Sequence, residues 1–189
     1  AGQTFLGNIG DNPFQSTSYY SLAVAAAELF KAAGSETFNI CETGFNAGHS
    51  ASAFLAASSN SVYYGWDLGI VPASHTIATM LQAKYPGRVN VEWGDSHATL
   101  PAFLAAHPEH KCHLLSIDGE HTPSGVFKDI EALLPHAEVG ATILVDDCST
   151  TRKNDAAMLA AYSGFGAAGG KVQLDERFRY ATVHMGSSG

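Results

Sequence analysis

Short apolar runs alternate with amphipathic segments along most of the chain, and this alternation limits the possible folds more than any single motif does. The apolar runs have the length of buried strands and cover residues 37–42, 62–67, 89–93, 113–118 and 141–146. Apolar residues at helical spacing predict helices at residues 19–33, 50–58, 73–85, 100–107, 125–136 and 155–162. Alternating strands and helices predict an α/β fold, an open and mostly parallel sheet with helices on both faces.

The C-terminal part has a different pattern. Two short β-like runs, 171–174 and 180–184, flank the charged stretch Asp175-Glu176-Arg177, which predicts an antiparallel hairpin and a sheet of seven strands in all. No linker, low-complexity tract or internal repeat interrupts the pattern. We therefore expect residues 1–189 to form a single domain, with residues 1–18 as a candidate N-terminal cap segment.

The composition excludes several classes of protein. Hydrophobic residues make up 46% of the 189-residue chain, so it can bury a full core and is not expected to be disordered. No apolar run approaches the ~18 residues of a membrane-spanning helix, so neither a membrane protein nor a membrane partner is expected. The net charge of −8 argues against sequence-independent nucleic-acid binding, which needs a basic face.

The cysteines give a prediction about the cellular compartment. Cys41, Cys112 and Cys148 form no CxxC pair and no zinc-binding spacing, and each lies in or beside an apolar run. They are therefore expected to be small buried hydrophobic residues in a reducing compartment. The N-terminus also lacks the basic-then-apolar pattern of a secretory signal, so a cytoplasmic location is expected.

Acidic residues follow every predicted parallel strand. Because ligands of open parallel sheets bind outside the carboxyl ends of the strands, these side chains are expected to converge on one site. The acids are Glu42, Asp67, Asp95, Asp118, Asp146 and Asp147.

A glycine-containing segment follows the first strand. In Glu42-Thr43-Gly44-Phe45-Asn46-Ala47-Gly48, Gly44 allows a tight turn and Gly48 lets the backbone approach a ligand at a helix start. The spacing is neither the dinucleotide fingerprint G-x-G-x-x-G nor a phosphate-binding loop, which disfavours nicotinamide and nucleoside triphosphate cofactors.

The acid followed by x-G-x-x-x-G resembles the first motif of class I S-adenosylmethionine-dependent methyltransferases, which have a Rossmann-like fold. The resemblance implies that Asp67 binds the ribose hydroxyls and that Asp95-Ser96 lies at the adenine. Two alternatives stay open from the residues alone, a strand-end turn role for Asp67 and a helix N-cap role for Asp95. The cofactor-binding residues expected from the resemblance are Glu42, Gly44, Phe45, Asn46, Gly48, Ser50, Asp67, Leu68, Asp95, Ser96 and Asp118.

A second motif concerns the chemistry. Ile117-Asp118-Gly119-x-His121, followed by a helix and the pair Asp146-Asp147, resembles metal-dependent O-methyltransferases of sugars or catechol-type diols. The resemblance implies that Asp118, Asp146 and Asp147 hold a divalent cation, Mg²⁺ or another. Carboxylates are hard oxygen ligands that suit Mg²⁺ or Ca²⁺. The alternative is that one or more of these acids only caps a helix.

The expected function is methyl transfer from S-adenosylmethionine to a hydroxyl of a small molecule, with the metal assisting. Asp118 and His121 are the expected catalytic residues, with His121 as the general base because an imidazole titrates near neutrality. An exposed loop histidine is the alternative for His121. A methyltransferase acting on another nucleophile and a non-catalytic S-adenosylmethionine-binding protein remain alternatives, and a homodimer is a candidate assembly.

Overall fold

The computed structural model describes residues 13–146, 171–175 and 180–184, with side chains described for residues 18–146. Its sheet contains β1 (Phe38–Thr43), β2 (Ser61–Asp67), β3 (Val89–Trp93), β4 (Cys112–Ile117), β5 (Ala137–Val145), β6 (Lys171–Asp175) and β7 (Tyr180–His184). The strand order is β3-β2-β1-β4-β5-β7-β6. The first five strands pair in parallel, as predicted, and β7 pairs antiparallel with both β5 and β6.

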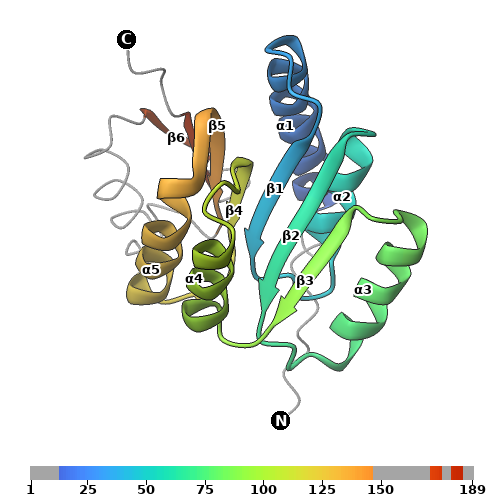
Figure 1. The fold of residues 1–189 in the computed structure, drawn as a ribbon, viewed down its shortest axis with the longest axis vertical. Coiled ribbons are helices and arrows are strands. Elements are labelled where there is room, and N and C mark those ends of the chain that lie inside the picture. The colour runs from blue at the N-terminus through green and yellow to red at the C-terminus, as the bar shows by residue number, and fades with distance from the viewer. Residues whose placement is uncertain (1–12, 147–170, 176–179, 185–189) are drawn as a thin grey trace.

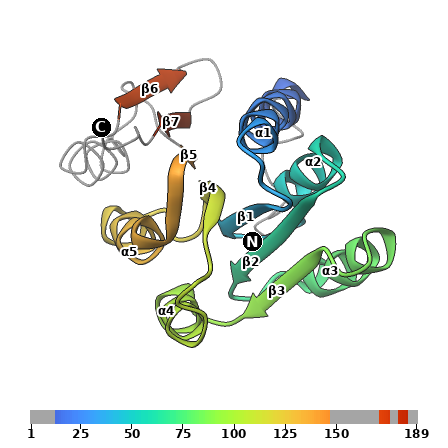
Figure 2. The ribbon, with the colours of Figure 1, turned by 45° about the horizontal axis from the view of Figure 1, so that its top comes forward.

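Helices cover both faces of the sheet (Figures 1 and 2). The helices α1 (Pro13–Ala32), α2 (His49–Ala57) and α3 (Pro72–Lys84) pack on one face, around Ile40, Leu114 and Leu144. The helices α4 (Ser96–Ala106) and α5 (Pro123–Leu133), which a 3₁₀ turn (Leu134–His136) follows, pack on the other face. Within the described ranges, no helix combines the length and the apolarity needed to cross a membrane.

The sequence predicted these helices and strands to within a few residues at most ends. The largest difference is at α1, which begins at Pro13 rather than 19. α4 begins at Ser96 rather than 100 because Asp95 caps it, and β5 begins at Ala137 rather than 141. The predicted helix at 155–162 and the residues that join β6 to β7 lie outside the described part of the chain.

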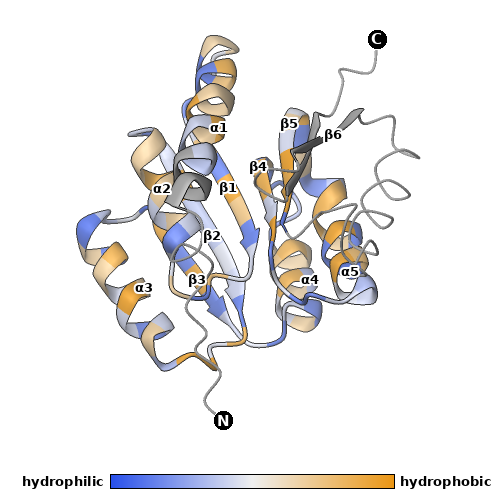
Figure 3. Cartoon of the chain, turned by 180° about the vertical axis from the view of Figure 1, so that it is seen from behind, coloured by the Kyte–Doolittle hydropathy of each residue, from blue (hydrophilic) through white to orange (hydrophobic). Residues whose placement is uncertain are grey.

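The core consists of two layers, one on each side of the sheet. The central strands β1 and β4 are almost entirely buried, and their hydrophobic residues are visible in Figure 3. Residues from β1, β4 and β5 contribute to both layers because alternate side chains of a strand point to opposite faces. A strand buried on both faces reads as a continuous apolar run, which is why these strands were recognisable in the sequence.

Two of the cysteines correct the prediction of free thiols. Cys41 and Cys112 form a disulfide between the neighbouring strands β1 and β4, with Cα atoms 5.8 Å apart and both residues fully buried. The prediction was right about burial and wrong about the free thiols, and a disulfide does not support the expected reducing compartment. Cys148 lies outside the described residues.

A register irregularity in β4 explains why the sequence did not predict the disulfide. Cys41 pairs with Leu115, so both side chains point to the α4–α5 face. If the side chains of β4 alternated strictly from Leu115, Cys112 would point to the opposite face. The pairing register of β4 with β5 shifts between Cys112 and Leu114, and this shift places Cys112 on the same face as Cys41. The cross-link closes a separation of 71 residues, worth about 4 kcal/mol of unfolding free energy in the chain-entropy description.

Candidate active site

The candidate site lies where the direction of the sheet order reverses. The chain builds outward from β1 through β2 to β3, and then returns to place β4 on the other side of β1. The loops after β1 and β4 therefore leave adjacent strands in different directions, an arrangement that opens a crevice at the carboxyl edge of the sheet. Figure 1 shows β1, β2 and β3 ending at this edge.

Glu42, near the end of β1, is fully buried beneath this crevice. Its carboxylate accepts hydrogen bonds from Ser50 Oγ (2.9 Å), Ser116 Oγ (2.9 Å) and the Tyr63 hydroxyl. Burial raises its pKa from 4.5 to about 7, although the three hydroxyl donors act in the opposite direction. Glu42 thus joins β1, β2, β4 and α2, while its predicted contact with the cofactor stays a prediction.

Gly44 and Gly48 set the shape of the loop after β1. Gly44 has φ +89°, and a Cβ at this position would overlap the carbonyl oxygen of Asp118 in the neighbouring loop. Gly48 has φ +66° immediately before α2, where a Cβ would lie 2.8 Å from the Phe45 ring. Both positions therefore require glycine, and Gly44 lets the two loops of the crevice meet backbone to backbone.

The other predicted residues of this loop have different surroundings. The Phe45 side chain is buried, with its ring centre 6.1 Å from that of Tyr63 and 6.0 Å from that of Trp93. The backbone N–H of Asn46 donates to Asp67 Oδ2 at 2.8 Å. Phe45 therefore anchors the loop in the core, and Asn46 ties it to the end of β2.

Asp67 lies at the end of β2 and organises two loops. Its Oδ2 accepts from Asn46, and its Oδ1 accepts from the N–H of Gly69 at 2.7 Å. Leu68, the next predicted residue, is exposed. The carboxylate combines the turn role with a position at the crevice, where its remaining lone pairs suit ribose hydroxyls.

Asp95 and Ser96 lie at the start of α4. Asp95 Oδ1 accepts from the N–H of His97 at 3.0 Å, which is the helix N-cap that the sequence left as an alternative. The Asp95 side chain is 65% exposed. Ser96 Oγ donates to Asp129 Oδ1 at 3.1 Å. The structure thus shows the capping role of Asp95, and its adenine contact stays a prediction.

Two predicted metal ligands follow neighbouring strands. Asp118 follows β4, and Asp146 follows β5 with its N–H bonded to the carbonyl of Ile117 at 3.0 Å. The pKa of Asp118 lies well above its usual range, mainly because the carboxyl is partly shielded from water and then because the Asp146 carboxylate is close. His121 Nε2 lies 3.2 Å from Asp118 Oδ1. The structure brings these three residues together, and Asp147 lies outside the described residues.

The sequence analysis did not assign two residues of the site. The Tyr19 hydroxyl of α1 donates to Asp146 Oδ1 at 2.8 Å, a contact that the sequence did not predict. Asp129 is buried in α5, bonded to Ser96 and 3.6 Å from His97 Nε2. An acid in the apolar series Val126, Asp129, Ile130 and Leu133 was a usable signal, because burying a carboxylate without polar partners is unfavourable.

The residues of the site suit both S-adenosylmethionine and a divalent cation, the two groups that the resemblance implies. The glycine loop and the strand-end acid Asp67 provide backbone close approach and a hydroxyl acceptor, which suits S-adenosylmethionine. Asp118 and Asp146 provide hard oxygen donors whose mutual repulsion a divalent cation would relieve. Asp118 remains accessible, with 27% of its side chain exposed.

The family comparison agrees with this geometry. Residues 41–148, more than half of the chain, match the family described as "Methyltransferase domain". The chain belongs to this family. The predicted resemblance to class I S-adenosylmethionine-dependent methyltransferases is therefore confirmed, and S-adenosylmethionine is the methyl donor of this enzyme. Among curated proteins, no relative matches the chain.

Several solved structures share the fold of this methyltransferase. CalS11, a TDP-rhamnose 3'-O-methyltransferase of calicheamicin biosynthesis, is 17% identical, with a TM-score of 0.68 over 98% of this chain and 89% of CalS11. An O-methyltransferase from Bacillus cereus in complex with SAH is 14% identical, with a TM-score of 0.65 over 92% and 81% of the two chains. TomG from Streptomyces achromogenes, in complex with SAM, is 14% identical, with a TM-score of 0.64 over 91% and 80%.

Replacing Gly44 by alanine should destabilise the protein more than the same change at Gly34. Both glycines have φ +89°, but a methyl group at Gly34 would meet open space, whereas a methyl group at Gly44 would overlap the Asp118 backbone. Gly34→Ala should lower the unfolding free energy by about 1 kcal/mol, and Gly44→Ala by a further 1–3 kcal/mol or so. Urea unfolding of both variants measures the difference, and equal losses would contradict the close approach of the two loops.

Glu42 should make folding stability depend on pH between about 4.5 and 7. Below pH 4.5 the carboxyl is protonated in both states, and as the pH rises the unfolded state ionises first. The unfolding free energy should therefore fall by about 3 kcal/mol across this window, from the pKa difference. Glu42→Gln should remove this fall when urea unfolding is compared at pH 5 and pH 8. An unchanged pH slope in that variant would assign the dependence to other groups.

Proposed function

We propose that this methyltransferase transfers the methyl group to a hydroxyl oxygen of a small molecule, with a divalent cation, most simply Mg²⁺, held by Asp118, Asp146 and Asp147. The observation that carries the proposal is the meeting of Asp118 and Asp146 at adjacent strand ends, beside the glycine loop after β1. The solved structures with the same fold support it, since their descriptions name O-methyltransferases.

The donor and the cation define the chemistry. S-adenosylmethionine would supply an activated methyl group on a good leaving group, and Mg²⁺ would supply a positive charge that lowers the pKa of an acceptor hydroxyl. The protein's part is then mainly positioning. The loop from Gly44 to Gly48 and Asp67 would orient the donor, and Asp118 with Asp146 would place the cation at the same edge of the sheet.

His121 is the residue that would take up the hydroxyl proton. Its Nε2 lies 3.2 Å from Asp118 Oδ1, and 54% of its side chain is exposed, so the ring can meet a substrate at the crevice. A carboxylate at this distance orients the imidazole and stabilises it once it is protonated. Tyr19 contributes by holding Asp146 Oδ1 through its hydroxyl.

Removing the metal should abolish methyl transfer and leave donor binding intact. With a panel of catechol-type and sugar diols, transfer of a labelled methyl group should stop with a chelator and return with Mg²⁺. Asp146→Asn should lower turnover by more than about tenfold, since even the loss of an outer partner of a metal site typically costs ~10–100-fold.

Glu109→Gln is the matched control, because it removes one exposed acid at the other end of β4 and should keep full activity. Full transfer to a diol in metal-free buffer would overturn the metal-assisted mechanism. Transfer only to nitrogen or macromolecular acceptors would overturn the hydroxyl acceptor, and donor binding without any transfer would indicate a binding protein.

His121→Ala should lower turnover at saturating substrate by about 10²–10⁴-fold, the usual contribution of a general base. Calorimetry should show unchanged affinity for S-adenosylhomocysteine, because in this proposal the ring faces the acceptor and not the donor. A loss smaller than tenfold would show that His121 is an exposed loop histidine and not the general base.

A further inference from the structure

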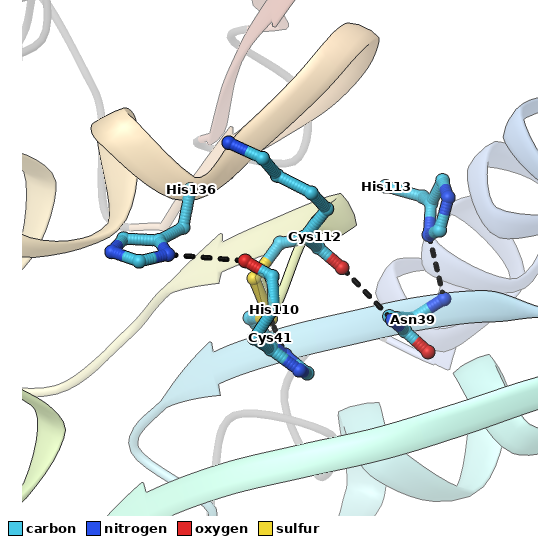
Figure 4. Close-up of a disulfide and its surroundings, with 7 residues drawn as sticks. Asn39, Cys41, His110, Cys112, His113 and His136 are labelled. Atoms are coloured by element: carbon cyan, nitrogen blue, oxygen red, sulfur yellow. Dashed lines mark hydrogen bonds between the residues drawn. A yellow bond between two sulfur atoms is a disulfide. The ribbon is translucent and has the colours of Figure 1, made fainter. Parts of the chain in front are cut away.

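A second cluster of metal-binding side chains lies on the opposite face of β1 from Glu42. The sulfurs of Cys41 and Cys112 are joined, and His110 Nε2 lies 3.5 Å from Cys41 Sγ (Figure 4). One ligand atom from each of these residues lies within 4.8 Å of the others, so the three converge on one point. The methyl-transfer mechanism uses none of them.

The surrounding structure holds the His110 ring toward the sulfurs. The His110 carbonyl accepts from His136 Nδ1 at 3.0 Å, which fixes the backbone before β4. The edge-on rings of Tyr64 and Phe103 enclose the imidazole, with ring centres 4.4 and 5.3 Å away.

The donor set of this cluster is soft. Two cysteine sulfurs and one imidazole nitrogen are typical zinc ligands, whereas Mg²⁺ and Ca²⁺ prefer oxygen. Both cysteines are fully buried and His110 is half-buried, so among the described residues of the cluster His110 is the one that solvent can reach. The cluster thus differs in chemistry from the carboxylates at the carboxyl edge of the sheet.

We propose that, when the disulfide is reduced, Cys41, Cys112 and His110 bind one Zn²⁺ ion, so that the disulfide and the metal site are alternative states of the same residues. The geometry allows the exchange: two sulfurs on tetrahedral zinc lie about 3.8 Å apart for bonds of about 2.3 Å. Side-chain rotation can provide this separation between Cα atoms 5.8 Å apart.

The exchange balances with a dithiol as the reductant. The dithiol gives two electrons, its own sulfurs join in a disulfide, and its two protons pass to Cys41 and Cys112 as the protein S–S bond breaks. Zn²⁺ then displaces the two thiol protons into solvent and binds two thiolates and the neutral imidazole. A disulfide oxidant reverses the exchange: it takes two electrons from the two thiolates, its own S–S bond breaks to give two thiolates, and the Cys41–Cys112 bond reforms as Zn²⁺ is released.

Cobalt substitution tests the proposal without reference to methyl transfer. The Cys148→Ser protein, which keeps only the two cysteines of the cluster, is reduced with a dithiol, freed of reductant under argon and titrated with Co²⁺. A sulfur-to-cobalt charge-transfer band should grow to one equivalent and disappear when Zn²⁺ displaces the cobalt. Co²⁺ at the carboxylate edge gives no such band, so the two sites are distinguished.

Three controls make the test specific. The oxidised protein should give no band, because its sulfurs are bonded to each other. His110→Ala should weaken Co²⁺ binding by more than about tenfold, since even the loss of an outer partner of a metal site typically costs ~10–100-fold. His107→Ala, which removes a more exposed histidine three residues away, should leave binding unchanged.

A measurement on the unmodified chain guards against variants that fail to fold. Zn²⁺ should protect Cys41 and Cys112 of the reduced native protein from alkylation, as mapped by mass spectrometry of the peptides. Absence of the charge-transfer band in the reduced protein, equal metal binding by the oxidised protein, or alkylation unaffected by Zn²⁺ would each overturn the proposal.

Discussion

The buried carboxylate of Glu42 is the contact on which the geometry of the crevice depends. Three hydroxyls, from α2, β2 and β4, converge on a single side chain of β1. Because a carboxyl deprived of water is stable only when hydrogen-bonded, these elements cannot move apart without leaving a polar group unpaired. The strand ends that carry Asp67 and Asp118 are therefore fixed relative to β1. The raised pKa of Glu42 reflects how completely water is excluded there.

Much of the fold and the outline of the site could be predicted from the sequence because both follow from periodic patterns. Strands buried on two faces must be continuously apolar, and helices packed on a sheet must keep one apolar side. A parallel sheet brings its strand ends to one edge, so acids such as Asp67, Asp118 and Asp146 could be assigned to a common site from their positions alone. The spacing of Gly44 and Gly48 further distinguished this loop from nucleotide-binding loops.

The remaining features depend on partners that are distant in sequence. Tyr19 bonds to Asp146 across 127 positions, which no local pattern reveals. A buried tyrosine hydroxyl or the acid Asp129 on an apolar helix face indicates that a partner exists without naming it. The Cys41–Cys112 pair depends on a register shift in β4, and strict alternation predicts the two side chains on opposite faces.

The contact between Tyr19 and Asp146 also has a consequence for the order of folding. It joins the first described helix to the end of the last parallel strand, so it can form only after β1, β4 and β5 have assembled beside one another. During synthesis, α1 leaves the ribosome long before its partner strand exists, and such long-range pairings form slowly. The apolar side of α1 can pack earlier, because its main partners belong to α2, β1 and β4, but the hydroxyl of Tyr19 must wait for β5. The edge of the sheet that carries Asp118 and Asp146 therefore takes its final form only after the last parallel strand has been added.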